Sequence, residues 1–197
     1  MKTKSKALLL ALCAVLLVAA SVLGTLAYLT STDTVENTFS VGSVVITLDE
    51  APVNADGKEI TGERVKENSY KLMPGHDYDK DPTVHVDEKS EDCWLFVEIT
   101  DEIAAIQDAK TIATQLTENG WTLVAGTTNI YAYKDIASAG DDVVVFETFK
   151  IKGDVKNDAL AAYDGKTIQV VAYAVQADGF DTAAKAWEAA FGTSAQG

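Results

Sequence analysis

The sequence has few basic residues, and this scarcity excludes whole classes of partner. Lys and Arg number 16 against 30 Asp and Glu, which gives a formal net charge of −14. Nucleic-acid binding depends on Lys and Arg that neutralise phosphates, and attraction to anionic lipid needs the same residues. We therefore expect that the protein does not bind nucleic acid and is not held to anionic membranes by electrostatic attraction. The acidic balance fits a protein that is kept soluble by its charge, or one that meets cations outside the cell.

Cysteine, histidine and proline are also scarce. Only one of the two cysteines, Cys93, lies beyond the first 27 residues, so no intramolecular disulfide is expected there. Cys93 lies beside Trp94 in an apolar segment that is predicted to be a strand, where a buried, inert thiol is the default. The histidines are His76 and His85, and the helical His-Glu-x-x-His zinc motif is absent. With three prolines and 13 glycines, a flexible multi-domain arrangement is not expected.

Long apolar runs are missing except at the N-terminus. Three lysines within the first six residues precede an apolar run at 7–23, and small residues follow it. This layout is typical of a secretory signal peptide, so we predict a leader at 1–27 with cleavage between Ala27 and Tyr28. Loss of its three lysines would leave 13 basic against 30 acidic residues, a net charge of −17. The alternative is an uncleaved membrane anchor, because the run is nearly long enough to span a bilayer.

The rest of the chain, 28–197, is predicted to be a single domain built mainly from strands. Short segments that alternate in polarity or are rich in β-branched and aromatic residues are typical of strands. They lie at 38–41 with 44–48, 83–86, 93–99, 121–124, 130–133, 143–151 and 167–175. A glycine-containing turn between 121–124 and 130–133 indicates a hairpin. About seven such strands separated by turns predict a β-sandwich.

Two stretches have the periodicity of helices. Residues 101–118 place four apolar side chains near one face: Ile103, Ile106, Ala113 and Leu116. Residues 181–191 are rich in alanine and place Trp187 and Phe191 at positions i and i+4. We predict one inserted helix that covers an edge or face of the sandwich, and one C-terminal helix. A further, weaker helical turn is predicted at 157–163.

The residues around the predicted cleavage site resemble a known family. The chain reads Gly24-Thr-Leu-Ala-Tyr-Leu-Thr, then Val35-Glu-Asn-Thr-Phe-Ser-Val-Gly-Ser-Val, then Ile46-Thr-Leu-Asp-Glu. This pattern resembles the TasA and camelysin family of exported proteins from Gram-positive bacteria, whose leaders are of the class cut by the signal peptidase SipW. Segments 70–82, 91–97 and 173–179 extend the resemblance into the body of the chain.

The resemblance implies a jelly-roll-like β-sandwich, preceded by a signal-peptide helix and released outside the cell. Family members assemble into biofilm-matrix fibres or sit on the cell surface, and the segment freed by the signal peptidase is donated as a strand to the next subunit. Here that segment would be 28–41, with Phe39 and Val41 as anchors. A sandwich that lacks an edge strand exposes backbone groups that another chain can satisfy. The alternative is that 28–41 pairs within its own chain or stays an unpaired terminus.

Camelysin-like members have been described as metal-dependent peptidases, so a metal site must be weighed. A zinc peptidase needs three protein ligands and a base that activates water. Five residues between positions 76 and 85 could supply ligands: His76, Asp77, Asp79, Asp81 and His85. The three acids that precede Pro82 equally fit an exposed turn that leads into a strand.

The same acids raise the question of calcium. Asp77, Asp79 and Asp81 have the spacing of the first ligands of an EF-hand loop, and Glu88 falls at its last position. Pro82 stands where that loop requires glycine, and the loop would contain a predicted strand, so the EF-hand is rejected. A looser surface calcium site stays open for so acidic a chain.

The sequence therefore predicts a secreted, non-enzymatic cell-surface or biofilm-matrix protein without a cofactor. Its expected partners are other copies or a related matrix subunit, and the signal peptidase during export. It would touch the membrane only through the leader before cleavage. Two alternatives remain: a camelysin-like metal-dependent endopeptidase, and a monomeric extracellular binding module for a sugar or a partner protein. A sugar site would use the aromatic residues of the strands, which otherwise fill the core.

Overall fold

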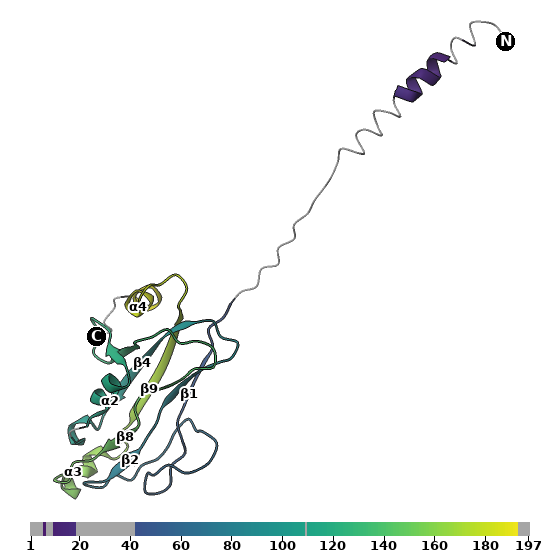
Figure 1. The fold of residues 1–197 in the computed structure, drawn as a ribbon. Coiled ribbons are helices and arrows are strands. Elements are labelled where there is room, and N and C mark those ends of the chain that lie inside the picture. The colour runs from purple at the N-terminus through teal and green to yellow at the C-terminus, as the bar shows by residue number, and fades with distance from the viewer. Residues whose placement is uncertain (1–5, 7–9, 19–41, 109, 193–197) are drawn as a thin grey trace. The chain divides into compact units, whose positions relative to one another are not determined.

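The computed structural model describes residues 6, 10–18, 42–108 and 110–192 (Figure 1). The chain divides into two compact units, Met1–Ser40 and Val41–Gly197. In the first unit, residues 10–18 are helical and exposed. Among the described residues, no helix is both long and apolar enough to cross a bilayer. The predicted cleavage between Ala27 and Tyr28 and the predicted strand at 38–41 lie outside the described residues and stay predictions.

The described residues of the second unit form three antiparallel sheets, which confirms the predicted mainly β, sandwich-like fold. The three-stranded sheet has the order β1 (Ile46–Asp49), β3 (Thr83–Val86), β7 (Asp142–Val144). The four-stranded sheet has the order β5 (Trp121–Leu123), β6 (Ile130–Tyr133), β4 (Cys93–Asp101), β9 (Ile168–Gln176). The remaining sheet pairs β2 (Asp77–Asp79) with β8 (Thr148–Lys150).

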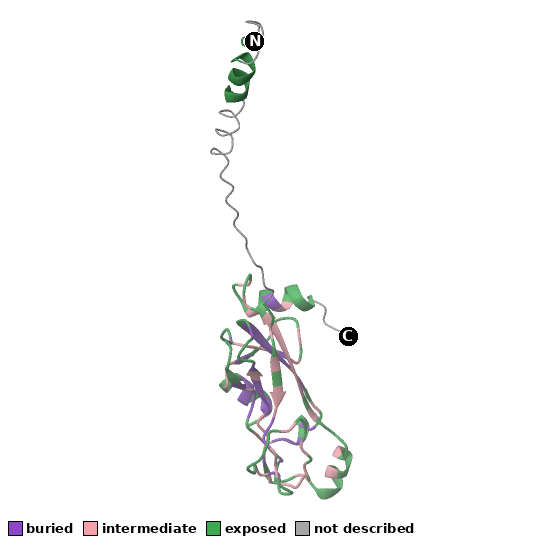
Figure 2. Cartoon of the chain, turned by 90° about the vertical axis from the view of Figure 1, so that its right-hand side faces the viewer, coloured by how far each residue is buried: buried purple, intermediate pink, exposed green. Residues whose placement is uncertain are grey.

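Strand β4 lies between β6 and β9 in its sheet, and its residues 93–97 are all buried, the class that Figure 2 draws in purple. Successive strand residues point to opposite faces. Leu95 and Val97 therefore enter the main core, together with Val84 of β3. Trp94 and Phe96 point the other way and pack under α4 (Ala183–Phe191). A strand covered on both faces has a continuous apolar run in its sequence, as residues 93–97 do.

A smaller core lies at the other end of the domain, beside β2 and β8. Tyr78 and Phe149, which are partners in register across these strands, stack with ring centroids 4.7 Å apart. Ile103, Ile106 and Ile151 complete the buried cluster. Because Tyr78 is 1% exposed, the acidic stretch around it is a strand with a buried centre and not only the turn that its composition suggests.

The single helix predicted over 101–118 is wrong. Strand β4 continues to Asp101, a 3-10 turn spans Ala104–Ile106, and α2 occupies only Ile112–Glu118. The Asp101 carboxylate accepts hydrogen bonds from the Ile103 backbone N–H at 3.1 Å and from Gln107 at 2.9 Å. These bonds favour a tight turn at the end of the strand over continued helix.

The apolar residues that suggested one long helix are divided between different surroundings. Ile103 and Ile106 belong to the smaller core, whereas Leu116 is buried in the main core. Ala113 is exposed. The helix-like spacing of apolar residues therefore comes from two short segments whose side chains are buried in two different cores.

The C-terminal helix and the weaker turn are confirmed. The Thr182 side chain caps α4 by accepting a hydrogen bond from the Lys185 backbone N–H. Trp187 and Phe191 contact each other with centroids 4.3 Å apart, as their i, i+4 spacing predicts. Around the weaker turn, α3 spans Asn157–Leu160 and continues into a 3-10 turn.

The strand predicted over 143–151 is interrupted, because the chain changes sheets between β7 and β8. Val145 and Phe146 are fully buried where the chain crosses over. Gln115 of α2, which is 3% exposed, supplies hydrogen bonds here in place of a neighbouring strand. Its side-chain carbonyl oxygen accepts from the N–H groups of Glu147 and Thr148 at 3.1 and 3.2 Å. Its amide nitrogen donates to the Thr148 carbonyl at 2.7 Å. A buried side chain therefore satisfies backbone groups that would otherwise lack partners.

Candidate functional site

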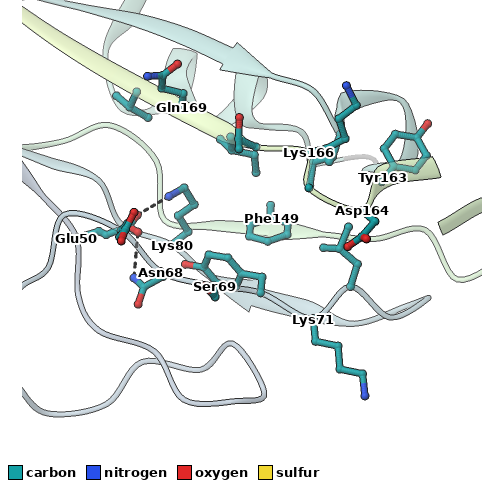
Figure 3. Close-up of a pocket in the computed structure, with 18 of the residues that line it drawn as sticks. Glu50, Asn68, Ser69, Lys71, Lys80, Phe149, Tyr163, Asp164, Lys166 and Gln169 are labelled. Atoms are coloured by element: carbon teal, nitrogen blue, oxygen red, sulfur yellow. Dashed lines mark hydrogen bonds and ion pairs between the residues drawn. The ribbon is translucent and has the colours of Figure 1, made fainter. Parts of the chain in front are cut away.

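An open groove of about 1340 Å³ runs along one side of the second unit (Figure 3). One wall is formed by residues 48–50 at the end of β1 and by the segment 66–72. The other wall is formed by residues 163–170, which lead into β9. Phe149 lies between the walls. The groove therefore separates two parts of the sandwich that are far apart in sequence.

The groove opens at the edges of two sheets. The edge of β9 is unpaired among the described strands, whereas on the β1 side the Glu50 backbone pairs with Val65 and the Leu48 carbonyl accepts a hydrogen bond from Lys66. Strand β9 pairs with β4 through all nine of its residues, and no other described strand pairs with its free edge. Strand β1 is an edge of the three-stranded sheet and approaches β9 without pairing with it. Side chains on both edges are only partly buried, among them Leu48, Val170 and Ala172. An open edge of this kind is a template for another strand.

The segment 67–72 has the side-chain pattern of a strand but no ladder partner among the described residues. Asn68, Tyr70 and Leu72 are half-buried, and the residues between them are exposed. Tyr70 anchors the segment: its hydroxyl donates to the Asp79 carbonyl at 3.0 Å, and burial together with the charge of Glu50 raises its pKa. The groove is therefore bounded on one side by the free edge of β9 and on the other by a segment that belongs to none of the sheets.

A buried polar cluster lies in the first wall. The Lys80 ammonium contacts the Glu50 carboxylate, and these side chains are only 10% and 6% exposed. Asn68 donates to the other Glu50 oxygen at 3.0 Å and to the Ala51 carbonyl at 2.8 Å. The Val53 N–H donates to the Asn68 side-chain oxygen at 3.1 Å. Each polar group in this cluster has a partner, as buried polar groups require.

The two histidines that were weak metal candidates lie in different surroundings. His76 precedes β2, and its Nε2 lies 2.7 Å from the Asp56 carbonyl oxygen. His85 is in β3, where Nε2 lies 2.9 Å from Asp49 and Nδ1 lies 2.5 Å from Asp142. Among the described residues, no group of three or more His, Cys, Asp and Glu is arranged to hold a metal ion.

The three candidate acids between the histidines differ in their partners. Asp77 is exposed. Asp79 forms an ion pair with Lys58 at 3.0 Å, and Asp81 forms one with Arg64 at 2.8 Å. Both acids therefore fasten the polar stretch that follows β1.

His85 is held between carboxylates from both neighbouring strands. Burial alone would lower its pKa, but its hydrogen bonds to Asp142 and Asp49 raise it. Burial would raise the pKa of Asp49, but Arg64 and His85 lower it. The arrangement stabilises a charged imidazole between two acids. Asp49 and Asp142 were not foreseen, because only the register of three strands brings them to His85.

The cluster of Glu50, Asn68 and Lys80 was also missed. Its members are separated by up to 30 residues, and they carry no motif that would link them. The only signal in the sequence was the alternation of polar and apolar residues around Tyr70. Comparison of the whole chain with known protein families, with curated proteins and with solved structures gave no match.

Proposed function

We propose that this protein is an exported cell-surface or matrix protein that assembles by strand donation, in which residues 28–41 of one copy enter the groove of the next. The observation that carries the proposal is the free edge of β9 facing the unpaired segment 67–72 across the groove. A strand added there would satisfy backbone groups on at least one wall and would cover partly buried apolar side chains.

The sequence of the donor segment fits this role. Four of the seven alternate positions from 29 to 41 are apolar (Leu29, Val35, Phe39 and Val41), and the other three are Ser31, Asp33 and Asn37. The alternate face carries mainly Thr, Ser and Glu. In an extended strand these residues occupy opposite faces, so one face would turn toward the groove and the other toward solvent.

A deletion tests the assembly. The chain 28–197 should form fibres visible by electron microscopy at high concentration, and the chain 42–197 should remain monomeric with an unchanged circular-dichroism spectrum. A synthetic peptide of residues 28–41 should bind the chain 42–197, whereas a scrambled peptide should not. Fibres from the chain 42–197 would contradict the proposal, and so would persistent monomers of the chain 28–197.

Point variants test the faces of the donor. Phe39→Asp and Val41→Asp place charges on the apolar face, so each should reduce the binding of the peptide by at least about tenfold. Thr38→Asp adds the same charge on the opposite face and serves as the matched control. Equal losses from all three changes would show that charge, and not the orientation of the strand, controls binding.

The endopeptidase alternative predicts a different result. Purified chain 28–197 would then cleave casein, and a chelator would abolish the cleavage. Such chelator-sensitive cleavage by homogeneous protein would replace the assembly proposal as the primary function.

A further inference from the structure

The Glu50 carboxylate lies between an amine and a carboxamide, an arrangement that strand donation does not require. Lys80 contacts one oxygen of Glu50, and the Asn68 amide nitrogen donates to the other at 3.0 Å (Figure 3). One carboxylate therefore touches both partners of a condensation reaction. We propose that Lys80 and Asn68 become joined by an intramolecular side-chain amide bond, with Glu50 as the catalytic residue that transfers protons.

The amine lies in a largely closed site. The side chains of Lys80 and Glu50 are 10% and 6% exposed, and the ring centroid of Tyr70 lies 5.9 Å from the lysine nitrogen. An ammonium group cannot attack a carbonyl, but a buried lysine in contact with a carboxylate can pass its proton to that base.

The carboxamide of Asn68 is also held for reaction. The Val53 N–H donates to its carbonyl oxygen at 3.1 Å, so a backbone dipole already points at the atom where negative charge would develop. Its nitrogen, the leaving group, lies against the Glu50 oxygen that does not contact Lys80. The carboxylate can therefore receive a proton on one side and deliver one on the other.

The reaction balances without an oxidant or a co-reactant. Glu50 takes a proton from Lys80, and the lone pair of the neutral amine forms a C–N bond to Cγ of Asn68. Glu50 then protonates the amide nitrogen of Asn68, and the bond from Cγ to that nitrogen breaks. Glu50 takes the second proton from the new amide and passes it to the released ammonia, which leaves as ammonium.

The bond would fasten the first wall of the groove. Asn68 belongs to the extended segment of that wall, and Lys80 lies between β2 and β3. A covalent link between them closes a short loop and restricts the unfolded chain. It would hold the segment 66–72 in place whether or not a strand occupies the groove.

Mass spectrometry of the folded full chain tests the bond. The intact mass should be lower than the sequence mass by one ammonia, after allowance for any cleavage of the leader. Trypsin should leave residues 67–71 covalently attached to residues 72–89, because an acylated Lys80 is no longer a cleavage site. Lys80→Arg and Glu50→Gln should each restore the full mass and separate the two fragments.

Matched controls separate this bond from other losses of ammonia. Asn68 precedes Ser69 and could lose ammonia by cyclising onto the backbone, but that loss would persist in Lys80→Arg and would leave no linked fragments. Lys66→Arg, which changes another lysine of the same groove, should keep the link. An unmodified mass for the folded wild-type chain, or an ammonia loss that survives in Lys80→Arg, would overturn the proposal. Circular dichroism establishes that each variant is folded.

Discussion

At the scale of single residues, His85 makes the stability of the three-stranded sheet depend on pH. Its pKa is raised because Asp142 and Asp49 outweigh the effect of burial. A raised pKa stabilises the fold below the unfolded value of about 6.5, and this contribution is lost as the pH rises through the folded value. Asp49, whose pKa is lowered with help from Arg64, contributes above its unfolded value and loses that contribution as the pH falls.

We therefore expect the free energy of unfolding to fall by about 1 kcal/mol more in the wild type than in His85→Gln between about pH 6 and about pH 9. Urea denaturation at several pH values measures the difference. Asp142→Asn should reduce the same pH dependence, because it removes one of the two charges that favour the protonated ring. Parallel pH profiles for the wild type and His85→Gln would exclude this role.

Cys93 gives a second prediction at this scale. Burial, followed by the charges of Asp92 and Asp141, raises the pKa of its thiol to about 11. Because only the thiolate reacts, alkylation at about pH 8 should be at least about a hundredfold slower in the folded than in the unfolded chain. A Cys13→Ser background leaves Cys93 as the single thiol to follow by mass spectrometry. Rapid alkylation of the folded chain would show that this strand opens readily.

At the scale of elements, α2 contributes to the stability of the fold mainly through one side chain, that of Gln115. Gln115 satisfies three backbone groups where the chain changes sheets. Gln115→Ala would leave these groups without partners in a buried site, so we expect a loss of about 2–4 kcal/mol in the free energy of unfolding. Gln115→Glu keeps the acceptor but loses the donor to Thr148 and should be intermediate or worse. A loss below about 0.5 kcal/mol would contradict this account.

The cap of α4 gives a smaller effect. Thr182→Ala removes the side-chain acceptor for the Lys185 N–H and should lower the free energy of unfolding by about 1 kcal/mol. Thr182→Ser keeps the hydroxyl and should stay close to the wild type. Thermal denaturation followed by circular dichroism measures the difference. Equal stability of the alanine variant would mean that aromatic packing alone fixes the start of the helix.

Elements whose pattern is local were predictable from the sequence. Local patterns of about ten residues identify three of the elements. Strand β4 has an apolar run, the hairpin of β5 and β6 has a turn between two strand patterns, and α4 has a helical periodicity that begins at a capping residue. The region 101–118 was not predictable, because the carboxylate of Asp101 turns the chain where the apolar spacing alone indicates a helix. The break between β7 and β8 depends on Gln115, which lies about 30 residues earlier.

The candidate site was less predictable than the fold. Its walls come from β1, the segment 66–72 and β9, whose proximity depends on the topology of the whole sandwich. Residues 76–85 attracted attention because His and Asp are chemically versatile. In the structure Asp79 and Asp81 instead hold the polar stretch after β1 through Lys58 and Arg64.

At the scale of the whole molecule, charge should control the rate of the proposed assembly. Each copy without its leader would carry a net charge of −17, since 13 basic residues then face 30 acidic ones. Like-charged copies repel one another, and salt screens that repulsion over about 10 Å at 0.1 M. We therefore expect fibre formation by the chain 28–197 to be faster at about 150 mM than at about 10 mM sodium chloride. Light scattering measures the rate, and slower assembly in salt would indicate that specific ion pairs between copies dominate.

The crossing between β7 and β8 has a consequence for how the domain comes apart. Residues 145 and 146 are fully buried, and the strands on either side of them, β7 and β8, belong to different sheets. Disruption of one ladder would pull this shared stretch out of the interior and deprive the other ladder of its support. The amide protons of both strands should therefore exchange with deuterium in a single cooperative opening. Peripheral segments can open locally, but the centre of the sandwich should open only as one unit.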